Sequence, residues 1–290
     1  MENKRLVTID CPVCGCAVFR RILSWKEEGS SIVRCSGCAL LYVNPRMTGQ
    51  EIKHFFEKDY IRTHREVEEV YDHSRGKTLS IIAAAVKRKK AGGRLLDVGC
   101  AAGKFLSLFA GESGWELHGA DVSEFAARKA KKIKGARIYN DDIMNLGLAD
   151  GYFDVVVMLD SLYFLPDPVT VLKEVRRVMK QDGILIIELP GLARMLWKAG
   201  PVSLLLKGRW NSFTPNQHLF FFSKKTLGAL LKKTGFYIDS VELVQSPQRK
   251  NMAVEAVNSA YLLFSNAVHA LTMKRFCISS RVVYSAMKAD

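Results

Sequence analysis

The amino-acid sequence predicts an α/β fold with a mostly parallel β-sheet, preceded by a small cysteine-rich module. Short apolar segments alternate with amphipathic segments between residues 93 and 190. This alternation is typical of βαβ units whose sheet is buried on both faces. The first apolar segment ends in a glycine-rich turn, and two close cysteine pairs precede it. We therefore expect helices on both sides of one sheet.

These patterns place the expected elements along the chain. Strands are expected at residues 94–99, 115–121, 136–141, 153–160, 184–190, 237–244 and 280–288. Helices are expected at residues 51–60, 77–90, 104–111, 123–135, 168–183 and 223–235.

A further amphipathic helix is expected near the C-terminus. Its apolar side chains recur every three or four residues and would form one stripe: Val254, Val257, Tyr261, Phe264, Val268 and Leu271. One interpretation is a helix that covers the sheet or a lid. The other is a helix that lies in the interface of a membrane.

Length and composition limit the class of protein. A chain of 290 residues suits one large domain with a small accessory module. The sequence has no window of 18 uncharged apolar residues, and its N-terminal MENKRLVTID lacks the apolar core of a signal peptide. We therefore expect a cytoplasmic protein whose paired cysteines are metal ligands rather than disulfides.

The net charge of +14 is concentrated in the last third of the chain. Residues 189–290 carry 14 basic and four acidic side chains, a net charge of +10, whereas residues 1–75 carry only +1. A basic surface attracts nucleic acid, phosphorylated small molecules or anionic lipid, and it also favours solubility in general. The near-neutral N-terminal segment argues against RNA as a partner, because ribbons that bind nucleic acid are usually basic.

The N-terminal module carries a metal-binding pattern. Cys11 and Cys14 form one C-x2-C pair, Cys35 and Cys38 form another, and 20 residues separate the pairs. Two such turns can direct four thiolates at one ion, which predicts a tetrahedral structural zinc site. We interpret the nearby Cys16 as a spare thiol, with ligation through Cys16 as the alternative.

The turn after the first strand has the features of a cofactor-binding loop. In LLDVGCAAGKF, Gly99 and Gly103 let the backbone approach a ligand, and the next helix points its electropositive N-terminus there. The spacing differs from the G-x-G-x-x-G of nicotinamide enzymes. Asp121, and then Asp141 and Asp142, end the next two strands. Carboxylates at these positions can accept hydrogen bonds from ribose hydroxyls.

Five segments, in this order, resemble the motifs of class I S-adenosylmethionine (SAM) dependent methyltransferases: LLDVGCAAGKF, GADVS, NDDIMNL, FDVVVMLDSLYFLPDP and EVRRVMKQDGILIIELP. The resemblance spans roughly residues 93–245. It implies a Rossmann-like sheet of seven mostly parallel strands, with residues 280–288 as an antiparallel last strand.

The same resemblance implies roles for individual residues. Asp121 would hold the ribose hydroxyls, and Asp142 with the backbone of Ile143 would contact the adenine. The methionine moiety would be lined by Asp97, Gly99, Cys100, Ala101 and Gly103. We interpret Cys100 as a small packing residue rather than a nucleophile.

The cysteine pairs and the downstream run NQHLFFFSKKTLGALLKKTGF are similar to a branch of this family with a zinc-binding N-terminal module. That branch includes sugar C-methyltransferases and enzymes of polysaccharide and secondary-metabolite clusters. The resemblance implies a zinc-binding module at residues 1–48 and a helical linker at 49–91. The methyltransferase domain would occupy residues 92–290, with a lid insertion at 191–222.

Two departures from the family pattern affect the site. Ala101 replaces the middle glycine of the turn, which restricts φ. Tyr163 and Phe164 stand where relatives often have a Glu-His pair, so the role of that histidine does not carry over. The remaining catalytic candidates are His218, Asp160 and Tyr163, as a base or as contacts of the acceptor. A structural histidine, and a pocket-wall tyrosine, are the alternatives.

The expected lid combines aromatic and basic side chains: Trp197, Trp210, Phe213, Phe220, Phe221, Phe222, Arg194, Lys198, Lys207 and Arg209. They suit an anionic, partly apolar small-molecule acceptor, such as a saccharide or a nucleotide-, phosphate- or lipid-linked intermediate. A peripheral contact with an anionic membrane is also consistent with them. The alternatives are an RNA methyltransferase, and a non-catalytic binding protein that keeps the SAM fold. The sequence predicts no oligomeric state.

Overall fold

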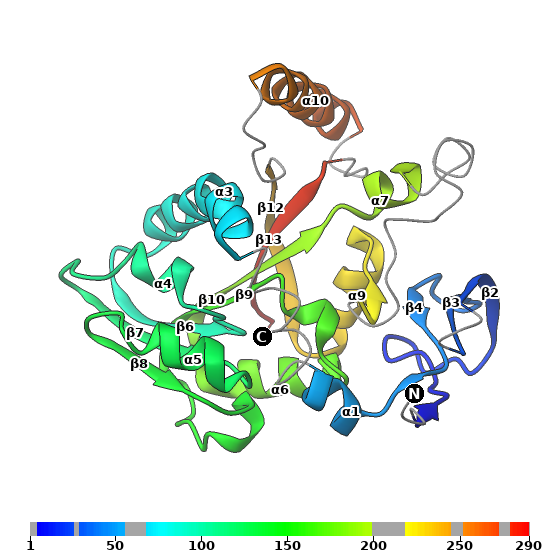
Figure 1. The fold of residues 1–290 in the computed structure, drawn as a ribbon, viewed down its shortest axis with the longest axis horizontal. Helices are drawn as coiled ribbons and strands as arrows, with labels where there is room; N and C mark the ends of the chain where they lie inside the picture. The colour runs from blue at the N-terminus through cyan, green and yellow to red at the C-terminus, as the bar shows by residue number, and fades with distance from the viewer. Residues whose placement is uncertain are drawn as a thin grey trace.

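A seven-stranded sheet forms the centre of the computed structural model, which describes residues 5–25, 29–55, 68–198, 218–244, 252–272 and 279–289 (Figure 1). The strand order is β12-β13-β10-β9-β6-β7-β8. The strands are β6 (Gly93–Val98), β7 (Trp115–Ala120), β8 (Ala136–Tyr139), β9 (Phe153–Leu159), β10 (Met179–Pro190), β12 (Phe236–Val244) and β13 (Arg281–Lys288).

The strand directions confirm the predicted fold class. Strands β6 to β10 pair in parallel, and β13 runs antiparallel to both β10 and β12. The carboxyl ends of the five parallel strands therefore meet at one edge of the sheet, which is where ligands bind in open α/β folds.

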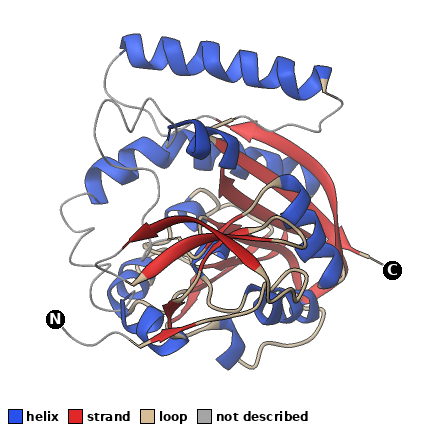
Figure 2. Ribbon diagram, turned by 90° about the vertical axis from the view of Figure 1, so that its right-hand side faces the viewer, coloured by secondary structure: helices blue, strands red, loops and turns tan. Residues whose placement is uncertain are grey.

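Helices cover both faces of the sheet (Figure 2). The long helices on one face are α6 (Pro168–Val178) and α9 (Lys224–Lys233); the other face carries α3 (Glu68–Lys89), α4 (Lys104–Ser107) and α5 (Glu124–Ala130). Leu185, Ile187 and Leu189 of β10 belong to the core with α6 and α9, whereas Ile184 and Ile186 belong to the core with α3. Both faces of the central strands are therefore apolar, as the run ILIIELP predicts.

Three further helices are α1 (Gly49–His54), α7 (Leu192–Lys198) and α10 (Met252–Leu271), and two short 3-10 helices span Ile143–Asn145 and Leu162–Phe164. Among the residues that the structure describes, no helix has the length and apolar character needed to cross a bilayer.

The N-terminal module shares its sheet with the rest of the chain. This second sheet has the order β11-β4-β3-β2. Its strands are β2 (Phe19–Trp25), β3 (Ser30–Cys35), β4 (Leu41–Val43) and β11 (Phe220–Phe221), and a separate pair joins β1 (Leu6–Val7) to β5 (Arg46–Met47). The fourth strand, β11, comes from the segment that the sequence predicts as a lid.

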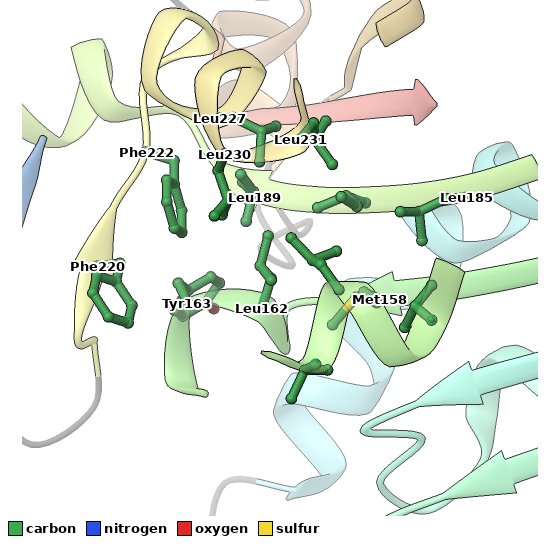
Figure 3. Close-up of a cluster of buried hydrophobic side chains, with 14 of the residues drawn as sticks. Met158, Leu162, Tyr163, Leu185, Leu189, Phe220, Phe222, Leu227, Leu230 and Leu231 are labelled. Carbon is green, nitrogen blue, oxygen red and sulfur yellow. The ribbon is translucent and has the colours of Figure 1, made fainter. Parts of the chain in front are cut away.

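A single apolar core joins this module to the seven-stranded sheet. Tyr42 of β4 and Phe220 of β11 belong to the same buried cluster as Leu189 of β10 and Leu230 of α9. Figure 3 shows part of this cluster, with the leucines of α9 facing β10 and Phe220 of β11 beside Tyr163. The module is therefore packed on the domain rather than tethered to it.

The predicted end of the helix at residues 168–183 is wrong. Helix α6 ends at Val178, and Met179 already pairs with Phe153 as the first residue of β10. A register irregularity between Met179 and Ile184 accommodates Gly183, which the sequence pattern indicates as a helix stop. Pairing with β9 thus overrides the local helix signal.

The interpretation that the apolar stripe of the C-terminal helix covers the sheet or a lid is wrong at two positions. The side chains of Val254 and Val257 lie outside the described ones. Tyr261 and Val268 are partly buried in α10, but Phe264 and Leu271 are 59% and 83% exposed. The reason is rotation of the helix: Ser265 is fully buried, so the inward face lies to one side of the stripe.

Candidate functional site

The glycine-rich turn after β6 has a left-handed backbone at three positions. The φ angle is 79° at Gly99, 47° at Ala101 and 77° at Gly103. A side chain at residue 99 would also place its Cβ 2.7 Å from the Cβ of Ser161, so glycine is required there. Ala101 adopts the left-handed conformation at a cost of about 1–2 kcal/mol. Its N–H donates to Asp121 at 2.8 Å, which holds the turn against the end of β7.

Asp97, near the carboxyl end of β6, is a buried carboxyl with an unused oxygen. Its side chain is 2% exposed, and Oδ1 has no hydrogen-bond partner among the described residues. Burial, and then the charge of Asp121, raise the pKa of Asp97 to about 8. A cationic ligand group would replace the hydration that this carboxylate lacks.

The next two strand ends supply further acceptors and a donor. Asp121 follows β7 and accepts hydrogen bonds from the N–H groups of Ala101 and Ser123, at 2.8 and 2.9 Å. Each carboxylate oxygen keeps a second lone pair for a ligand. Asp142 follows β8 and caps the short helix that begins at Ile143. The first N–H of a helix has no partner within it, so Ile143 offers a donor beside an acceptor.

One cavity of about 810 Å³ joins these groups, a volume suited to small-molecule ligands. The predicted cofactor residues that line it are Asp97, Gly99, Cys100, Ala101, Asp121, Asp142 and Ile143; Gly103 does not. Cys100 is 5% exposed and belongs to the core under the turn, in agreement with a packing role. The catalytic candidates Asp160, Tyr163 and His218 line the same cavity.

The strand order gives this cavity two ends. Asp97 lies near the carboxyl end of β6, and Asp121 and Asp142 follow β7 and β8, in one half of the sheet. Asp160 follows β9, and Arg281 begins the antiparallel β13, in the other half. The cavity therefore extends from the β6–β8 end to the β9–β13 end along the carboxyl edge of the sheet.

The β9–β13 end contains a buried network of two arginines and two carboxylates. Nη1 of Arg75 lies 2.7 Å from Oδ2 of Asp160, and Arg75 also pairs with Glu188. Arg281 pairs with both carboxylates. Burial opposes the charge of Asp160, but Arg281 and Arg75 outweigh it and hold the pKa of Asp160 well below its usual range. Asp160 is therefore a fixed anion rather than a proton acceptor near neutral pH.

Tyr163 and His218 form an aromatic wall beside this network. The hydroxyl of Tyr163 donates to Oδ1 of Asp160 at 2.9 Å. The His218 ring stacks on the Tyr163 ring, with centroids 4.7 Å apart and planes 5° apart. Burial lowers the pKa of His218 to about 4, so the ring is neutral near pH 7. Its Nδ1 has no hydrogen-bond partner within the described part of the chain, so a ring nitrogen remains for a ligand.

Sequence reasoning missed the charged network. Glu188 gave a signal, because it is a lone charge inside the apolar strand ILIIELP. No sequence pattern indicates Arg75 or Arg281 as site residues, because each lines the cavity only through the packing of α3 and β13. The expected lid residues Lys207, Arg209, Trp210 and Phe213 lie outside the described residues.

The four paired cysteines come together in the N-terminal module. Their Sγ atoms all lie within 4.8 Å of one another, with 3.5 Å between Cys11 and Cys38 and 3.4 Å between Cys14 and Cys35. In a tetrahedron with Zn–S bonds of about 2.3 Å the sulfurs lie about 3.8 Å apart, so the cluster has the size of a zinc site. Cys16 is not one of these four, and its thiol donates to the carbonyl of Val18 at 3.5 Å.

Comparisons with known proteins agree with this architecture. A family profile described as a methyltransferase domain matches residues 71–241. A 2-methyl-6-phytyl-1,4-hydroquinone methyltransferase of Synechocystis is 33% identical over 100 residues, or 33% of this chain and 31% of the relative. A demethylmenaquinone methyltransferase of Bacillus velezensis is 32% identical over 143 residues, or 46% and 60%. The chain thus spans less than two thirds of the length of these relatives.

Solved structures share the fold over more of the chain. A 1,6-didemethyltoxoflavin-N1-methyltransferase of Burkholderia thailandensis with bound S-adenosylhomocysteine is 16% identical, with a TM-score of 0.55 over 92% of this chain and 99% of that one. The magnesium protoporphyrin IX methyltransferase of Synechocystis PCC 6803, also with S-adenosylhomocysteine, is 13% identical, with a TM-score of 0.53 over 83% and 99%. The family profile covers more than half of the chain, and the fold and the cavity agree with it: the chain belongs to the methyltransferase-domain family.

Proposed function

We propose that this protein transfers a methyl group from SAM to a small-molecule acceptor. The observation that carries the proposal is the single cavity, which joins acidic strand ends at β6–β8 to an aromatic and ionic wall at β9–β13. We name these the cofactor end and the acceptor end. A bisubstrate reaction needs two adjoining subsites of this kind, because the methyl group must pass directly between its donor and its acceptor.

The chemistry of the cofactor end fits SAM. The unpartnered Oδ1 of Asp97 suits the amino group of the methionine moiety. The Asp121 carboxylate suits the two ribose hydroxyls, which donate hydrogen bonds. Asp142 and the N–H of Ile143 offer an acceptor and a donor for the edge of the adenine. Two structural neighbours of the same fold contain S-adenosylhomocysteine, which supports this assignment.

The acceptor end supplies alignment and a base. Bound SAM provides a methyl group on a cationic sulfur, and the methyl group is transferred by in-line displacement. The stacked rings of Tyr163 and His218 hold the acceptor flat and exclude water. Asp160 stays ionised and orients the hydroxyl of Tyr163. Where the acceptor atom has a proton to lose, the neutral ring of His218 accepts it.

An apolar, lipid-linked acceptor fits this end better than an anionic one. The two arginines that line the cavity are balanced by Asp160 and Glu188, so they leave no net charge for an anion. The aromatic wall favours a planar or apolar group. The relatives named for a phytyl hydroquinone and for demethylmenaquinone support a lipid-like acceptor. The hypothesis of an anionic acceptor was based partly on Lys207 and Arg209, which lie outside the described residues.

We further propose that Cys11, Cys14, Cys35 and Cys38 hold a structural zinc ion. Four thiolates fill a tetrahedral site and leave no position for a substrate. The division into a zinc module at 1–48, a linker at 49–91 and a methyltransferase domain at 92–290 stays a prediction, as do the cytoplasmic location and the lid. Metal analysis should find one zinc ion per chain, and the Cys14→Ser/Cys35→Ser double variant should lose it.

Calorimetric titration with S-adenosylhomocysteine tests the function. Zinc-replete protein should bind it, and Asp121→Ala should raise the Kd about 10–100-fold, because a hydrogen bond to a charged group contributes about 1.5–3 kcal/mol. Asp150→Ala is the matched control, since the Asp150 side chain is 79% exposed. No binding by the wild-type protein would reject the proposal. Transfer of labelled methyl groups into lipid extracts, rather than aqueous extracts, tests the acceptor class.

A further inference from the structure

Over residues 260–271, helix α10 presents its large apolar side chains to the outside and buries polar ones. Leu263, Phe264 and Leu271 are 72%, 59% and 83% exposed. Ser265 is fully buried and His269 is 8% exposed. At about 100° per residue, these two sets lie on opposite faces of the helix. The outward face is therefore apolar, the reverse of the arrangement expected for a helix in water.

The inward face of α10 already has its partners. The helix contacts β12, and the guanidinium of Arg194 on α7 lies 4.7 Å from the centre of the Tyr261 ring. Figures 1 and 2 show α10 as the outermost helix on its side of the molecule, beyond α3 and α7. Packing within the described part of the chain thus explains Tyr261 and Ser265, and it leaves Leu263, Phe264 and Leu271 exposed.

Scattered apolar side chains on a protein surface are ordinary, but these are not scattered. Leu263, Phe264 and Leu271 are within two turns of one helix face, and Ala267 and Ala270 between them are also exposed. Leu196 of the adjacent α7 is 43% exposed. Several exposed apolar side chains on one helix face indicate a surface that something apolar covers.

The charges around α10 favour an anionic bilayer as that cover. Between residues 252 and 271 the sequence has one charged side chain, Glu255, and no lysine or arginine. Basic pairs flank this stretch on both sides, Arg249 with Lys250 and Lys274 with Arg275. A stretch with an apolar face and with cations beside it in the sequence has the composition of a helix that lies in the interface of a membrane with negatively charged lipids.

We propose that the outward face of α10, formed by Leu263, Phe264 and Leu271, docks on the surface of an anionic lipid bilayer. Helix α7, which packs on α10 through Arg194, contributes Met195 to the acceptor end of the cavity. Docking therefore brings the acceptor end close to the lipid surface. The delivery of a lipid-linked acceptor from that surface rests on the proposed function, but the docking itself does not.

Vesicle flotation with the full-length, zinc-replete chain tests the proposal. The wild-type protein should float with phosphatidylcholine vesicles that contain about 30% phosphatidylglycerol, and not with pure phosphatidylcholine. Sodium chloride at about 0.5 M should weaken the association. The Leu263→Ser/Phe264→Ser double variant should lose it about tenfold or more. Val18→Ser/Ile22→Ser is the matched control and should float like the wild type, since Val18 and Ile22 are exposed in the N-terminal module.

Three outcomes would overturn the docking. The wild type does not float with anionic vesicles, or the α10 double variant floats equally well, or the chain is a dimer in solution that the α10 double variant dissociates. The last result would assign the face to a second copy of the chain. Titration of the same variants with S-adenosylhomocysteine separates this question from the proposed function. Flotation with anionic vesicles but no binding of S-adenosylhomocysteine would reject the methyltransferase proposal alone. Binding of S-adenosylhomocysteine without flotation would reject the docking alone.

Discussion

The two ends of the cavity are built in different ways. At the cofactor end, the predicted ligand contacts lie at or just after the carboxyl ends of three neighbouring strands, between residues 97 and 143. At the acceptor end, Arg75, Asp160, His218 and Arg281 come from four separate elements and span more than 200 residues. The cofactor end is therefore a local feature of the βαβ units, and the acceptor end is a product of tertiary packing.

The acceptor end also depends on the N-terminal module. The N–H of Val43 in β4 donates to the carbonyl of Leu219 at 2.9 Å. The N–H of Leu219 in turn donates to the carbonyl of Tyr163 at 3.0 Å. His218 precedes Leu219, so the pairing of β4 with β11 fixes the histidine over Tyr163. The difference between the two ends teaches that one sheet edge can combine a cavity end formed by neighbouring strands with another that a separate small sheet holds in place.

The largest expected effect is at the buried ion network of the acceptor end. Arg281→Met removes one cation and leaves Asp160 and Glu188 sharing Arg75. Breaking a buried network in this way should lower the free energy of unfolding by about 3 kcal/mol or more. Arg128→Met is the control, because Arg128 pairs with Glu124 on the surface, and its loss should cost less than about 0.5 kcal/mol. Urea denaturation measures both; equal midpoints would show that the network does not hold the acceptor end together.

The second prediction is that cofactor binding depends on pH through Asp97 at the cofactor end. The pKa of Asp97 is about 8 in the ligand-free protein, so binding of the cofactor amino group must displace a proton below that pH. The Kd for S-adenosylhomocysteine should rise by up to about tenfold per pH unit as the pH falls from 8 to 6. Asp97→Asn should bind more weakly at pH 8 and flatten this dependence. A dependence that persists in the variant would assign the proton to another group.

The carboxyl of Asp97 also makes the free energy of unfolding depend on pH, and the direction follows from its raised pKa. Its folded pKa of about 8 exceeds its ordinary value of 3.8, so the folded protein binds the extra proton. The ligand-free protein therefore loses stability at this group as the pH rises from about 4 to 8. At the acceptor end, the pKa of His218 is about 4 and that of Asp160 is depressed, so neither group titrates between pH 6 and 8.

The third prediction concerns the link from the zinc module to the acceptor end. Removal of the metal should loosen β4 and β11, because the binding free energy of a structural zinc ion is also folding free energy. Hydrogen exchange at the amides of Val43 and Leu219 should become about tenfold faster or more. The amide of Gly99, which donates to the carbonyl of Ala120 at 2.8 Å, should exchange as before.

Cys16→Ser is the control for this experiment, since Cys16 lies outside the four-cysteine cluster. The variant should retain zinc and show the exchange rates of the wild type. If metal removal speeds exchange equally at Gly99 and Leu219, the two ends are one cooperative unit, and the contrast between them disappears.

Much of the cofactor end could be predicted from the sequence because its signals are local. The turn at Gly99 and the carboxylates of Asp121 and Asp142 follow apolar strands at regular intervals, and the structure places them along one cavity. The seven-stranded sheet follows from the same alternation. The cysteine cluster was equally predictable, since two C-x2-C turns specify their own geometry.

The rest could not be predicted because it depends on which elements pack together. No local pattern indicates that Arg75 of α3 meets Arg281 of β13, or that Phe220 pairs with Tyr42 of the N-terminal module. The prediction of which face of α10 packs inward was wrong for the same reason. Its apolar residues surround more of the helix than one stripe, so periodicity alone cannot select the face that packs inward.

The smallest expected effect is at Ala101, where this chain departs from the glycine of its relatives. With φ at 47°, alanine costs about 1–2 kcal/mol, and a glycine there would remove that strain at an entropic cost of about 0.5–1 kcal/mol. Ala101→Gly should therefore raise the free energy of unfolding by about 0.5–1 kcal/mol. Ala102→Gly, at the neighbouring position without a positive φ, should lower it by a similar amount. Thermal unfolding of both variants gives the comparison. Both residues keep the N–H that donates to Asp121, so a loss of stability in Ala101→Gly would mean that the entropic cost of glycine exceeds the backbone strain of alanine.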